Sequence, residues 1–320
     1  MAGIAVAIVA LLVLTTQSAA TTAVRLERYA MLTPSDATCF TGSAPRTPGY
    51  DPVTHRIYVP NQEGNISVFN ETCHLVGTIT PPSGALPIQA AFDPANNYVY
   101  VTDYALNQVY AISGTRIVAT ITGFDAPKGI TFDEFIPGMV VVNSGNDQVD
   151  VLVGTENFGE FFFTGTDPFE VVFDPLCVCD LVTNTGSDNV TVHVDFTGTT
   201  FSTAVGKSPR GMAYDPGRGL DYVANSGSNT VSVLRAGILS NTISGFDGPY
   251  GVAWDQSTLT IWVTNTANGK VYEIGGSSGI SIVKKLSTAS DSDPLGLAYD
   301  EFDNDMYVTG FNTNVVYVLT

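Results

Sequence analysis

The sequence predicts an all-β fold, a seven-bladed β-propeller with four-stranded antiparallel blades. Two observations lead to this prediction. A unit of 40–45 residues recurs seven times and begins at a proline, a period that favours a propeller or a solenoid. The units carry short alternating segments, and no apolar pattern of helical period is long enough to predict a helix. The seven prolines are Pro45, Pro87, Pro127, Pro168, Pro209, Pro249 and Pro294.

Three further positions keep their residue type in every unit. An aromatic residue stands five residues after the proline, an aspartate six and a valine fourteen. The aromatic residues are Tyr50, Phe92, Phe132, Phe173, Tyr214, Trp254 and Tyr299. The aspartates are Asp51, Asp93, Asp133, Asp174, Asp215, Asp255 and Asp300. The valines are Val59, Val101, Val141, Val182, Val223, Val263 and Val308. Seven matches at three fixed offsets do not arise by chance, so the units are structural repeats.

Each unit divides into four short strands, called A to D in chain order. In the fifth unit strand A is Arg210–Tyr214, and a turn signal, Asp215-Pro-Gly, follows it. Strand B ends at residues 222–225, and strand C is the alternating segment 231–234. Strand D is looser, as in Gly77-Thr-Ile-Thr. Four strands per unit fit propeller blades; a β-solenoid, which would have shorter and simpler coils, is the alternative.

The two ends of the repeat array predict how the ring closes. The seventh unit stops after its strand C, Val315–Leu319, and lacks strand D. The segment Ala37–Ala44 looks like the strand D and turn that precede the other prolines. We therefore expect residues 37–41 to complete the last blade, so that residues 37–320 form one domain.

Composition excludes two classes of partner. The chain has 320 residues, 44% of them hydrophobic and only 14% charged, with 31 glycines and 17 prolines that suit many strands joined by turns. Its net charge of −18 would repel nucleic-acid phosphates and anionic lipid. A solubilising acidic surface is expected. The remaining partner classes are a protein or a surface polymer, and the oligomeric state is left open.

The N-terminal segment differs in kind from the repeats. Residues 1–24 carry no charged side chain, and Ile4–Leu14 is entirely apolar. Residues 1–20 are expected to be a signal peptide cleaved after Ala20, with an uncleaved N-terminal anchor as the alternative, and residues 21–36 a lead-in. Either reading makes the protein secreted or attached to the cell surface. Three sequons agree with export and make it a candidate glycoprotein: Asn65, Asn70 and Asn189.

The ends of the B strands carry a resemblance to a known family. They read Tyr58-Val-Pro-Asn, Tyr100-Val-Thr-Asp, Leu181-Val-Thr-Asn, Tyr222-Val-Ala-Asn, Trp262-Val-Thr-Asn and Tyr307-Val-Thr-Gly. These segments resemble the YVTN family of β-propeller repeats over residues 45–320. No copy spells Tyr-Val-Thr-Asn in full, and the third unit reads Val140-Val-Val-Asn. The resemblance implies an extracytoplasmic or surface-layer-like protein and fixes no activity.

The repeated residues are interpreted as blade architecture rather than as a ring of functional groups. The aromatic residue is expected to pack between neighbouring sheets, and replacing Phe173 by Ala to cost about 3–5 kcal/mol. The aspartate is expected to hold the A–B turn through its side chain. An asparagine that nearly repeats at the end of strand B is expected to bind the backbone of the B–C turn. It is present at Asn61, Asn143, Asn184, Asn225 and Asn265.

Function is expected where the copies differ, at the mouth of the channel formed by the D–A and B–C loops. The first positions of strand A surround that mouth: Arg46, Ile88, Lys128, Phe169, Arg210, Tyr250 and Leu295. Beside them stand Gln89 and Glu170, where most other copies have glycine. Three of only thirteen basic residues occupy one equivalent position. They predict an anion or carboxylate site with Tyr250 and Phe169 as apolar platforms, unless they are simply surface cations.

Enzyme motifs are scarce. His55, His74 and His193 fall in turns or in an outer strand, so none is placed as a base on a channel-bound substrate. The chain resembles the streptogramin (virginiamycin B) lyases, which are similar propellers. That resemblance implies a histidine and a metal-binding acid at the mouth, but none of the three histidines here stands at that place. The sequence therefore favours a non-enzymatic binding or surface-structural module without a cofactor. The alternative is a metal-dependent lyase or lactonase-like enzyme that uses the channel mouth and a divalent cation.

The four cysteines are sorted by the predicted topology. Cys39 lies in the closing strand and Cys73 in the C–D turn of the first blade, so a Cys39–Cys73 disulfide is expected. Cys177 and Cys179 lie across the ring in the fourth blade. They would form a small ring with each other, stay free or bond another chain.

Overall fold

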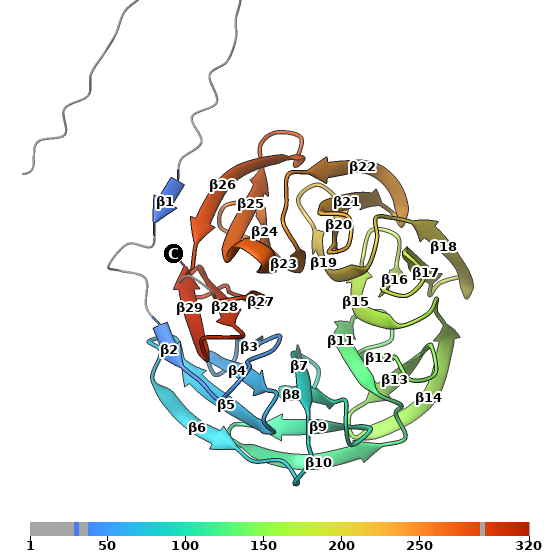
Figure 1. Cartoon of the computed structure of the whole chain (residues 1–320). Coiled ribbons are helices and arrows are strands. Elements are labelled where there is room, and N and C mark those ends of the chain that lie inside the picture. Colours follow the sequence, from blue (N-terminus) through green and yellow to red (C-terminus); the bar gives the residue numbers. More distant parts are fainter. Residues whose placement is uncertain (1–28, 32–37, 289–291, 320) are drawn as a thin grey trace, which may run out of the picture.

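The computed structural model describes residues 29–31, 38–288 and 292–319, and these residues form the predicted seven-bladed propeller (Figure 1). Seven antiparallel sheets stand around a central channel, and each sheet runs from an inner strand A to an outer strand D. The expected signal peptide, residues 1–20, and most of the lead-in lie outside the described residues.

The first four blades follow one another along the chain. Blade 1 contains β3 (Gly49–Asp51), β4 (Arg56–Asn61), β5 (Asn65–Asn70) and β6 (Leu75–Ile79). Blade 2 contains β7 (Pro87–Asp93), β8 (Tyr98–Asp103), β9 (Gln108–Ser113) and β10 (Arg116–Thr122). Blade 3 contains β11 (Pro127–Asp133), β12 (Gly138–Asn143), β13 (Gln148–Val153) and β14 (Glu156–Phe163). Blade 4 contains β15 (Pro168–Asp174), β16 (Cys179–Asn184), β17 (Asn189–Val194) and β18 (Thr199–Ala204).

The last three blades have the same plan. Blade 5 contains β19 (Pro209–Asp215), β20 (Leu220–Asn225), β21 (Thr230–Arg235) and β22 (Ile238–Ser244). Blade 6 contains β23 (Pro249–Asp255), β24 (Thr260–Asn265), the 3₁₀ turn η1 (Thr266–Asn268), β25 (Lys270–Gly275) and β26 (Ser281–Ser287). Blade 7 contains β27 (Pro294–Asp300), β28 (Asp305–Gly310) and β29 (Val315–Leu319). In the part of the chain that the structure describes, no helix is long and apolar enough to cross a membrane.

The N-terminal strands close the ring as the sequence predicts. Strand β2 (Thr38–Phe40) pairs antiparallel with β29, in the register Cys39 opposite Val316, and becomes the outer strand of blade 7. A second short strand, β1 (Tyr29–Met31), pairs parallel with β26 and extends blade 6 outward. From the sequence, only a lead-in is expected at these residues.

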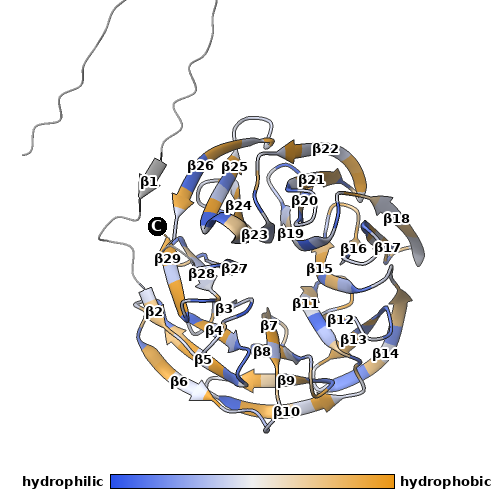
Figure 2. Cartoon of the chain, viewed as in Figure 1, coloured by the Kyte–Doolittle hydropathy of each residue, from blue (hydrophilic) through white to orange (hydrophobic). Residues whose placement is uncertain are grey.

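The hydrophobic core is divided among the interfaces between blades. Apolar stretches mark the strands of all seven blades (Figure 2). At the interface between blades 1 and 2, Tyr58 of β4 packs in one cluster with Val99 of the next blade, and its hydroxyl donates to Gly114 O at 2.8 Å. Tyr100 and Tyr222 make the same kind of hydrogen bond to the following blade. These three interfaces thus combine apolar burial with a polar tie.

The repeated aspartates hold the A–B turns, as expected. All seven are at most 3% exposed. Asp255 is typical: its Oδ1 accepts hydrogen bonds from the backbone N–H groups of Ser257 and Thr258 at 2.8 and 3.1 Å. The backbone N–H groups of the turn cannot bond a neighbouring strand. The aspartate carboxylate accepts their hydrogen bonds instead.

The predicted role of the repeated aromatic residues is wrong for Phe173. All seven aromatic side chains are half-buried, and Phe173 belongs to none of the buried clusters. Several of them line a pocket of about 420 Å³ at the end of the channel opposite the predicted mouth: Tyr50, Phe92, Trp254 and Tyr299. A half-exposed ring loses less than a core ring when truncated, so Phe173→Ala costs less than the about 3–5 kcal/mol expected from the sequence.

The asparagines at the ends of the B strands also act differently from the expectation. The Asn143 side-chain oxygen accepts the N–H of Asp125, and that of Asn265 accepts the N–H of Asp247, both in D–A loops. The Asn184 amide donates within its own blade. Asn143 and Asn265 therefore join the D–A loop to strand B. The other three donate across the B–C turn to side chains at the start of strand C rather than to the turn backbone: Asn61 to Asn65, Asn184 to Asn189 and Asn225 to Thr230.

Candidate functional site

The first side chains of the seven A strands surround one pocket at the face of the D–A and B–C loops. Its volume is about 210 Å³, which suits a small molecule. The structure brings together all seven residues named from the sequence: Arg46, Ile88, Lys128, Phe169, Arg210, Tyr250 and Leu295. Gln89 also lines the pocket. Thr47, Leu86 and Tyr104 line it too, and sequence reasoning missed them. Thr47 stands at the repeat position of Gln89 and Glu170, so the repeat itself could have identified it, whereas Leu86 and Tyr104 lie in loops.

Threonines of the B strands fix the backbone beneath these side chains. The hydroxyl of Thr102 donates to Lys128 O at 2.7 Å, and that of Thr183 donates to Arg210 O at 2.7 Å. In each case the acceptor lies in the next blade. The same Thr183 hydroxyl accepts the N–H of Glu170 at 3.1 Å. The threonine of the B-strand motif therefore links strand A of its own blade to strand A of the next, which holds the rim of the mouth rigid.

Below the rim the inner strands approach one another so closely that glycine is required. A Cβ on Gly211 would lie 2.5 Å from the backbone oxygen of Tyr250. Three blades have a side chain at this level instead: Thr47 in blade 1, Gln89 in blade 2 and Glu170 in blade 4. The Gln89 amide donates to Glu170 Oε1 across the channel at 2.9 Å and to Ile130 O at 3.3 Å. Side chains 81 residues apart in sequence thus meet in the channel floor.

Glu170 is the buried acid of the channel. Its side chain is 7% exposed, and a small cavity that it shares with Phe169 and Tyr250 lies directly below the mouth. Burial raises the pKa of Glu170 from 4.5 to about 7, although the hydrogen bonds from Gln89 and from the N–H of Val171 act in the opposite direction. A carboxyl group with this pKa exchanges protons readily near neutral pH.

The rim carries positive charge above that acid. Lys128 forms an ion pair with Asp167 at 2.5 Å. The Arg46 Nη2 donates to Gln62 Oε1 at 2.6 Å. Arg210 has no carboxylate within ion-pair distance among the described residues, and its Nε is buried without a hydrogen-bond partner. The Arg210 side chain is therefore the best-placed group to receive an anion.

Two aromatic rings hold Arg210 in place. Its guanidinium lies 4.9 Å from the Phe169 ring centre and 5.5 Å from that of Tyr250. The two rings meet edge to face with centroids 5.6 Å apart. Burial raises the pKa of Tyr250, and the neighbouring Arg210 and Arg46 oppose that rise. Arg210 is thus stacked by cation–π contacts while its donors face the pocket.

The mouth does not suit a divalent cation. It offers one buried carboxyl group, Glu170, below three basic side chains, and the nearby Asp167 is paired with Lys128. A divalent ion needs several oxygen ligands and would meet the repulsion of these three cations. The mouth is therefore suited to an anion.

The remaining residues named from the sequence lie away from the mouth. His55 follows β3, His74 precedes β6, and His193 lies in β17 with its ring stacked on Phe162 at 4.3 Å. The sequon residues Asn65 and Asn189 are half-buried, and each accepts a hydrogen bond from the asparagine that ends the preceding strand. Glycosylation at Asn65, Asn70 and Asn189 stays a prediction.

Both cysteine pairs are disulfides in the structure. Cys39 and Cys73 are joined with Cα atoms 5.1 Å apart, so the closing strand β2 is stapled to blade 1 as well as paired with blade 7. Cys177 and Cys179 are joined within the A–B hairpin of blade 4, with Cα atoms 5.2 Å apart. The described residues include no free cysteine.

Comparison with solved structures finds enzymes of the same fold. The virginiamycin B lyase of Staphylococcus aureus superposes with a TM-score of 0.77 at 12% identity, covering 89% of this chain and 99% of that chain. A streptogramin B lyase structure gives the same TM-score and identity, with coverage of 89% and 97%. The hydrazine synthase of Kuenenia stuttgartiensis gives a TM-score of 0.74 at 16% identity, with coverage of 86% and 95%. These likenesses show the fold.

Two expectations change with these comparisons. No family model and no curated protein matches the chain, so membership of the YVTN family is not confirmed. The reading of the chain as a non-enzymatic binding or surface-structural module is corrected, because the similar structures include enzymes.

Proposed function

We propose that this protein is an enzyme of the lyase type that acts on a small anionic substrate at the channel mouth, with Glu170 as its proton-transfer group. The observation that carries the proposal is the buried carboxyl of Glu170, with a pKa of about 7, beneath a rim of basic side chains. Acid–base catalysis works best with a group whose pKa lies near the working pH.

Each residue has a separate role in the proposed reaction. Arg210 binds the carboxylate or carbonyl oxygen of the substrate, held by its stacking on Phe169 and Tyr250. The Glu170 carboxylate removes the proton from the carbon next to that carbonyl. The electron pair of the broken C–H bond forms a C=C bond, and the C–O bond at the following carbon breaks, so that the leaving oxygen takes its electrons away. Arg210 and Arg46 stabilise the negative charge that develops on the substrate.

Gln89 positions the proton-transfer group. Its amide donates to Glu170 Oε1 at 2.9 Å and thereby orients the carboxyl group in the channel. Because the mouth does not suit a divalent cation, the proposed reaction needs none. This separates it from a metal-dependent lyase or lactonase, which the sequence left open.

The test is turnover of a panel of small carboxylates and esters that carry an oxygen leaving group at the β carbon, followed by the absorbance of the new double bond. Wild-type turnover should rise with pH through about 7 as Glu170 ionises. Glu170→Gln should lose about 10²–10⁴-fold in kcat, and Arg210→Gln should mainly raise KM. Glu156→Gln, on the exposed edge of blade 3, is the matched control. Equal turnover in Glu170→Gln, or no turnover of any panel member, would overturn the proposal.

We also propose that the protein is exported. Two disulfides agree with an oxidising compartment, and the sequons with a glycosylated product. Mass spectrometry of the chain purified from its source tests this: cleavage after Ala20 with both disulfides intact supports export, and reduced cysteines with an intact N-terminus contradict it.

A further inference from the structure

Two interfaces between blades break the pattern of the other five. Twelve residues after its proline, a blade places a side chain against the preceding blade. In five blades this side chain is apolar and at most 1% exposed: Ile57, Val99, Met139, Ile261 and Met306. Each shares a cluster with an aromatic residue of the preceding blade. Blades 4 and 5 have Asp180 and Asp221 there instead, and both are fully buried.

The preceding blades differ at the same two places. Blades 3 and 4 have Val140 and Leu181 where the other five have a tyrosine or tryptophan. The aromatic ring is therefore missing at both interfaces where the buried aspartate is present. Because the two changes occur together, we infer that the space left by the aromatic ring accommodates a polar group.

At the interface between blades 3 and 4, Asp180 meets two further acids. These are Asp133, the last residue of β11, and Asp195, directly after β17. Carboxylate oxygens of the three residues lie within 4.8 Å of one another. Asp133 and Asp180 are fully buried, and the Asp195 side chain is 1% exposed. The cluster lies on the face opposite the channel mouth, where the A–B and C–D turns gather.

Five carboxylate oxygens of this cluster have no hydrogen-bond partner. They are both oxygens of Asp180, both of Asp195, and Oδ2 of Asp133. The nearest basic group, His193 Nε2, is 3.9 Å from Asp195 Oδ1. Buried polar atoms normally have partners, and three carboxylates close together in a low-dielectric interior repel one another strongly. Such a set is neutralised either by protons or by a cation at its centre.

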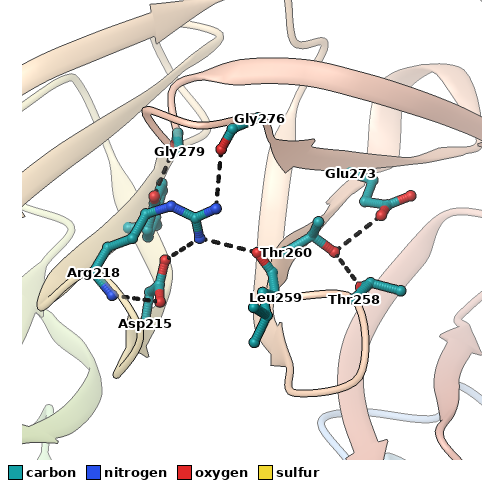
Figure 3. Close-up of polar contacts among 9 residues, drawn as sticks. Asp215, Arg218, Thr258, Leu259, Thr260, Glu273, Gly276 and Gly279 are labelled. Carbon is teal, nitrogen blue, oxygen red and sulfur yellow. Dashed lines mark hydrogen bonds and ion pairs between the residues drawn. The ribbon is translucent and has the colours of Figure 1, made fainter.

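The interface between blades 5 and 6 shows how a positive charge fills the corresponding place (Figure 3). There Arg218 binds Asp215 Oδ2 at 2.7 Å, and it reaches Leu259 O and Gly276 O of the next blade at 2.9 and 3.0 Å. Asp215 is the repeat equivalent of Asp133, and Gly276 that of Asp195. The guanidinium thus bridges the two blades between these positions.

Blade 3 has no such cation of its own. The equivalent of Arg218 is Ile136, which cannot neutralise Asp133. In blades 1, 2 and 6 this position supplies a hydrogen-bond donor to the same carboxylate: Thr54, Asn96 and Thr258. Asp133 is therefore free to turn its second oxygen toward Asp180 and Asp195.

We propose that Asp133, Asp180 and Asp195 form a Ca²⁺ site that bridges blades 3 and 4, in the place that the Arg218 guanidinium takes between blades 5 and 6. Calcium accepts six to eight oxygen ligands in flexible geometry and takes carboxylates in bidentate fashion, so five available protein oxygens suit it. Magnesium demands a near-ideal octahedron and keeps several waters, for which a buried set of this kind is poorly suited.

The ion would act as a structural tie. Asp133 comes from blade 3 and the other two ligands from blade 4, so binding adds a tie between blades whose inner contact is the apolar cluster of Val140 and its neighbours. In blade 5 alanine, Ala236, replaces the third acid, so Asp221 is not part of a three-acid cluster among the described residues. Asp221 is thus a natural control within the same chain.

The experiment measures ion binding directly. The full chain is stripped with EDTA and titrated with CaCl₂ by calorimetry, and its melting temperature is recorded with Ca²⁺ and with Mg²⁺. One Ca²⁺ per chain is expected, with a rise in Tm of roughly 4 °C at one hundred times Kd. Asp180→Asn and Asp195→Asn should each abolish the rise. Asp221→Asn and Glu170→Gln should keep it, which separates this site from the channel mouth.

Three outcomes would overturn the proposal. The first is the absence of a Ca²⁺-dependent rise in wild-type Tm, which would mean that protons neutralise the cluster. The second is a rise that persists in both Asp180→Asn and Asp195→Asn, which would place the ion elsewhere. The third is a response to Mg²⁺ alone. Asp195→Asn keeps the test decisive if Asp180→Asn fails to fold, because its side chain lies at the end of the cluster nearest the C–D turn.

Discussion

Glu170→Gln should stabilise the protein at alkaline pH and leave its stability unchanged in acid. Burial raises the pKa of Glu170 from 4.5 to about 7. The folded state therefore holds the proton more tightly than the unfolded chain does. Consequently, the free energy of unfolding falls as the pH rises from about 4.5 to about 7, and the loss is complete above that range.

The size of the effect follows from the two pKa values. Their difference of about 2.5, at roughly 1.4 kcal/mol per pH unit, makes ionised Glu170 cost about 3 kcal/mol. Glutamine keeps the shape of the side chain and an oxygen that accepts the Gln89 amide, but it carries no charge to desolvate. The variant should therefore exceed the wild type by up to about 3 kcal/mol at pH 8 and match it near pH 4.5.

Urea denaturation at the two pH values, followed by tryptophan fluorescence, measures this difference. Glu156→Gln on the exposed edge of β14 serves as the control and should show no such pH dependence. A stability difference between Glu170→Gln and wild type that is equal at both pH values would refute the reasoning. The carboxyl group would then be solvated rather than buried, and its suitability for proton transfer at neutral pH would be lost.

Three further predictions concern the ring and its interfaces. Replacing Cys39 and Cys73 by serine opens a disulfide with a sequence separation of 34, and the free energy of unfolding should fall by about 4 kcal/mol in urea titrations. Tyr222→Phe removes the 2.8 Å hydrogen bond to Gly279 O and should cost about 1–2 kcal/mol in the same assay; no change would mean that water replaces the hydroxyl. Thr183→Val removes the hydroxyl that joins the inner strands of blades 4 and 5. The variant should therefore have both a lower Tm and a higher KM for the anionic substrate. A lower Tm with an unchanged KM would show that the rim does not depend on this link.

The channel mouth illustrates how far the sequence carries a site prediction. The seven residues at the first position of strand A were identified from the repeat alone. Residues at the same position of each repeat lie at the same height around the channel of a propeller. The repeat did not predict that Gln89 and Glu170 bond to each other, since the distance across the channel depends on how closely the inner strands pack. The missing catalytic histidine argued against an enzyme, yet the acid that we propose for proton transfer, Glu170, is distinguished by its burial, which a linear pattern does not reveal.

The repeated aromatic residues met the expectation in part. Five of them are half-buried and pack against the clusters between blades, whereas Phe173 and Tyr214 belong to none, and several line the far end of the channel. Recurrence indicates that every blade needs a residue, without saying how much solvent it meets. The acid cluster carried a signal that was available: aligned on the prolines, Asp180 and Asp221 interrupt a column of otherwise apolar residues.

The sequence by itself determined the all-β class, the seven repeats, the closing strand at residues 38–40, and the ring of residues at the mouth. Each of these depends on local patterning and on a period that the chain repeats, which are properties of the order of residues. Only the tertiary structure decided the protonation behaviour of Glu170, the pairing across the channel, and the meeting of Asp133, Asp180 and Asp195. Those features depend on desolvation and on distances between neighbouring blades, and they exist only once the ring has closed.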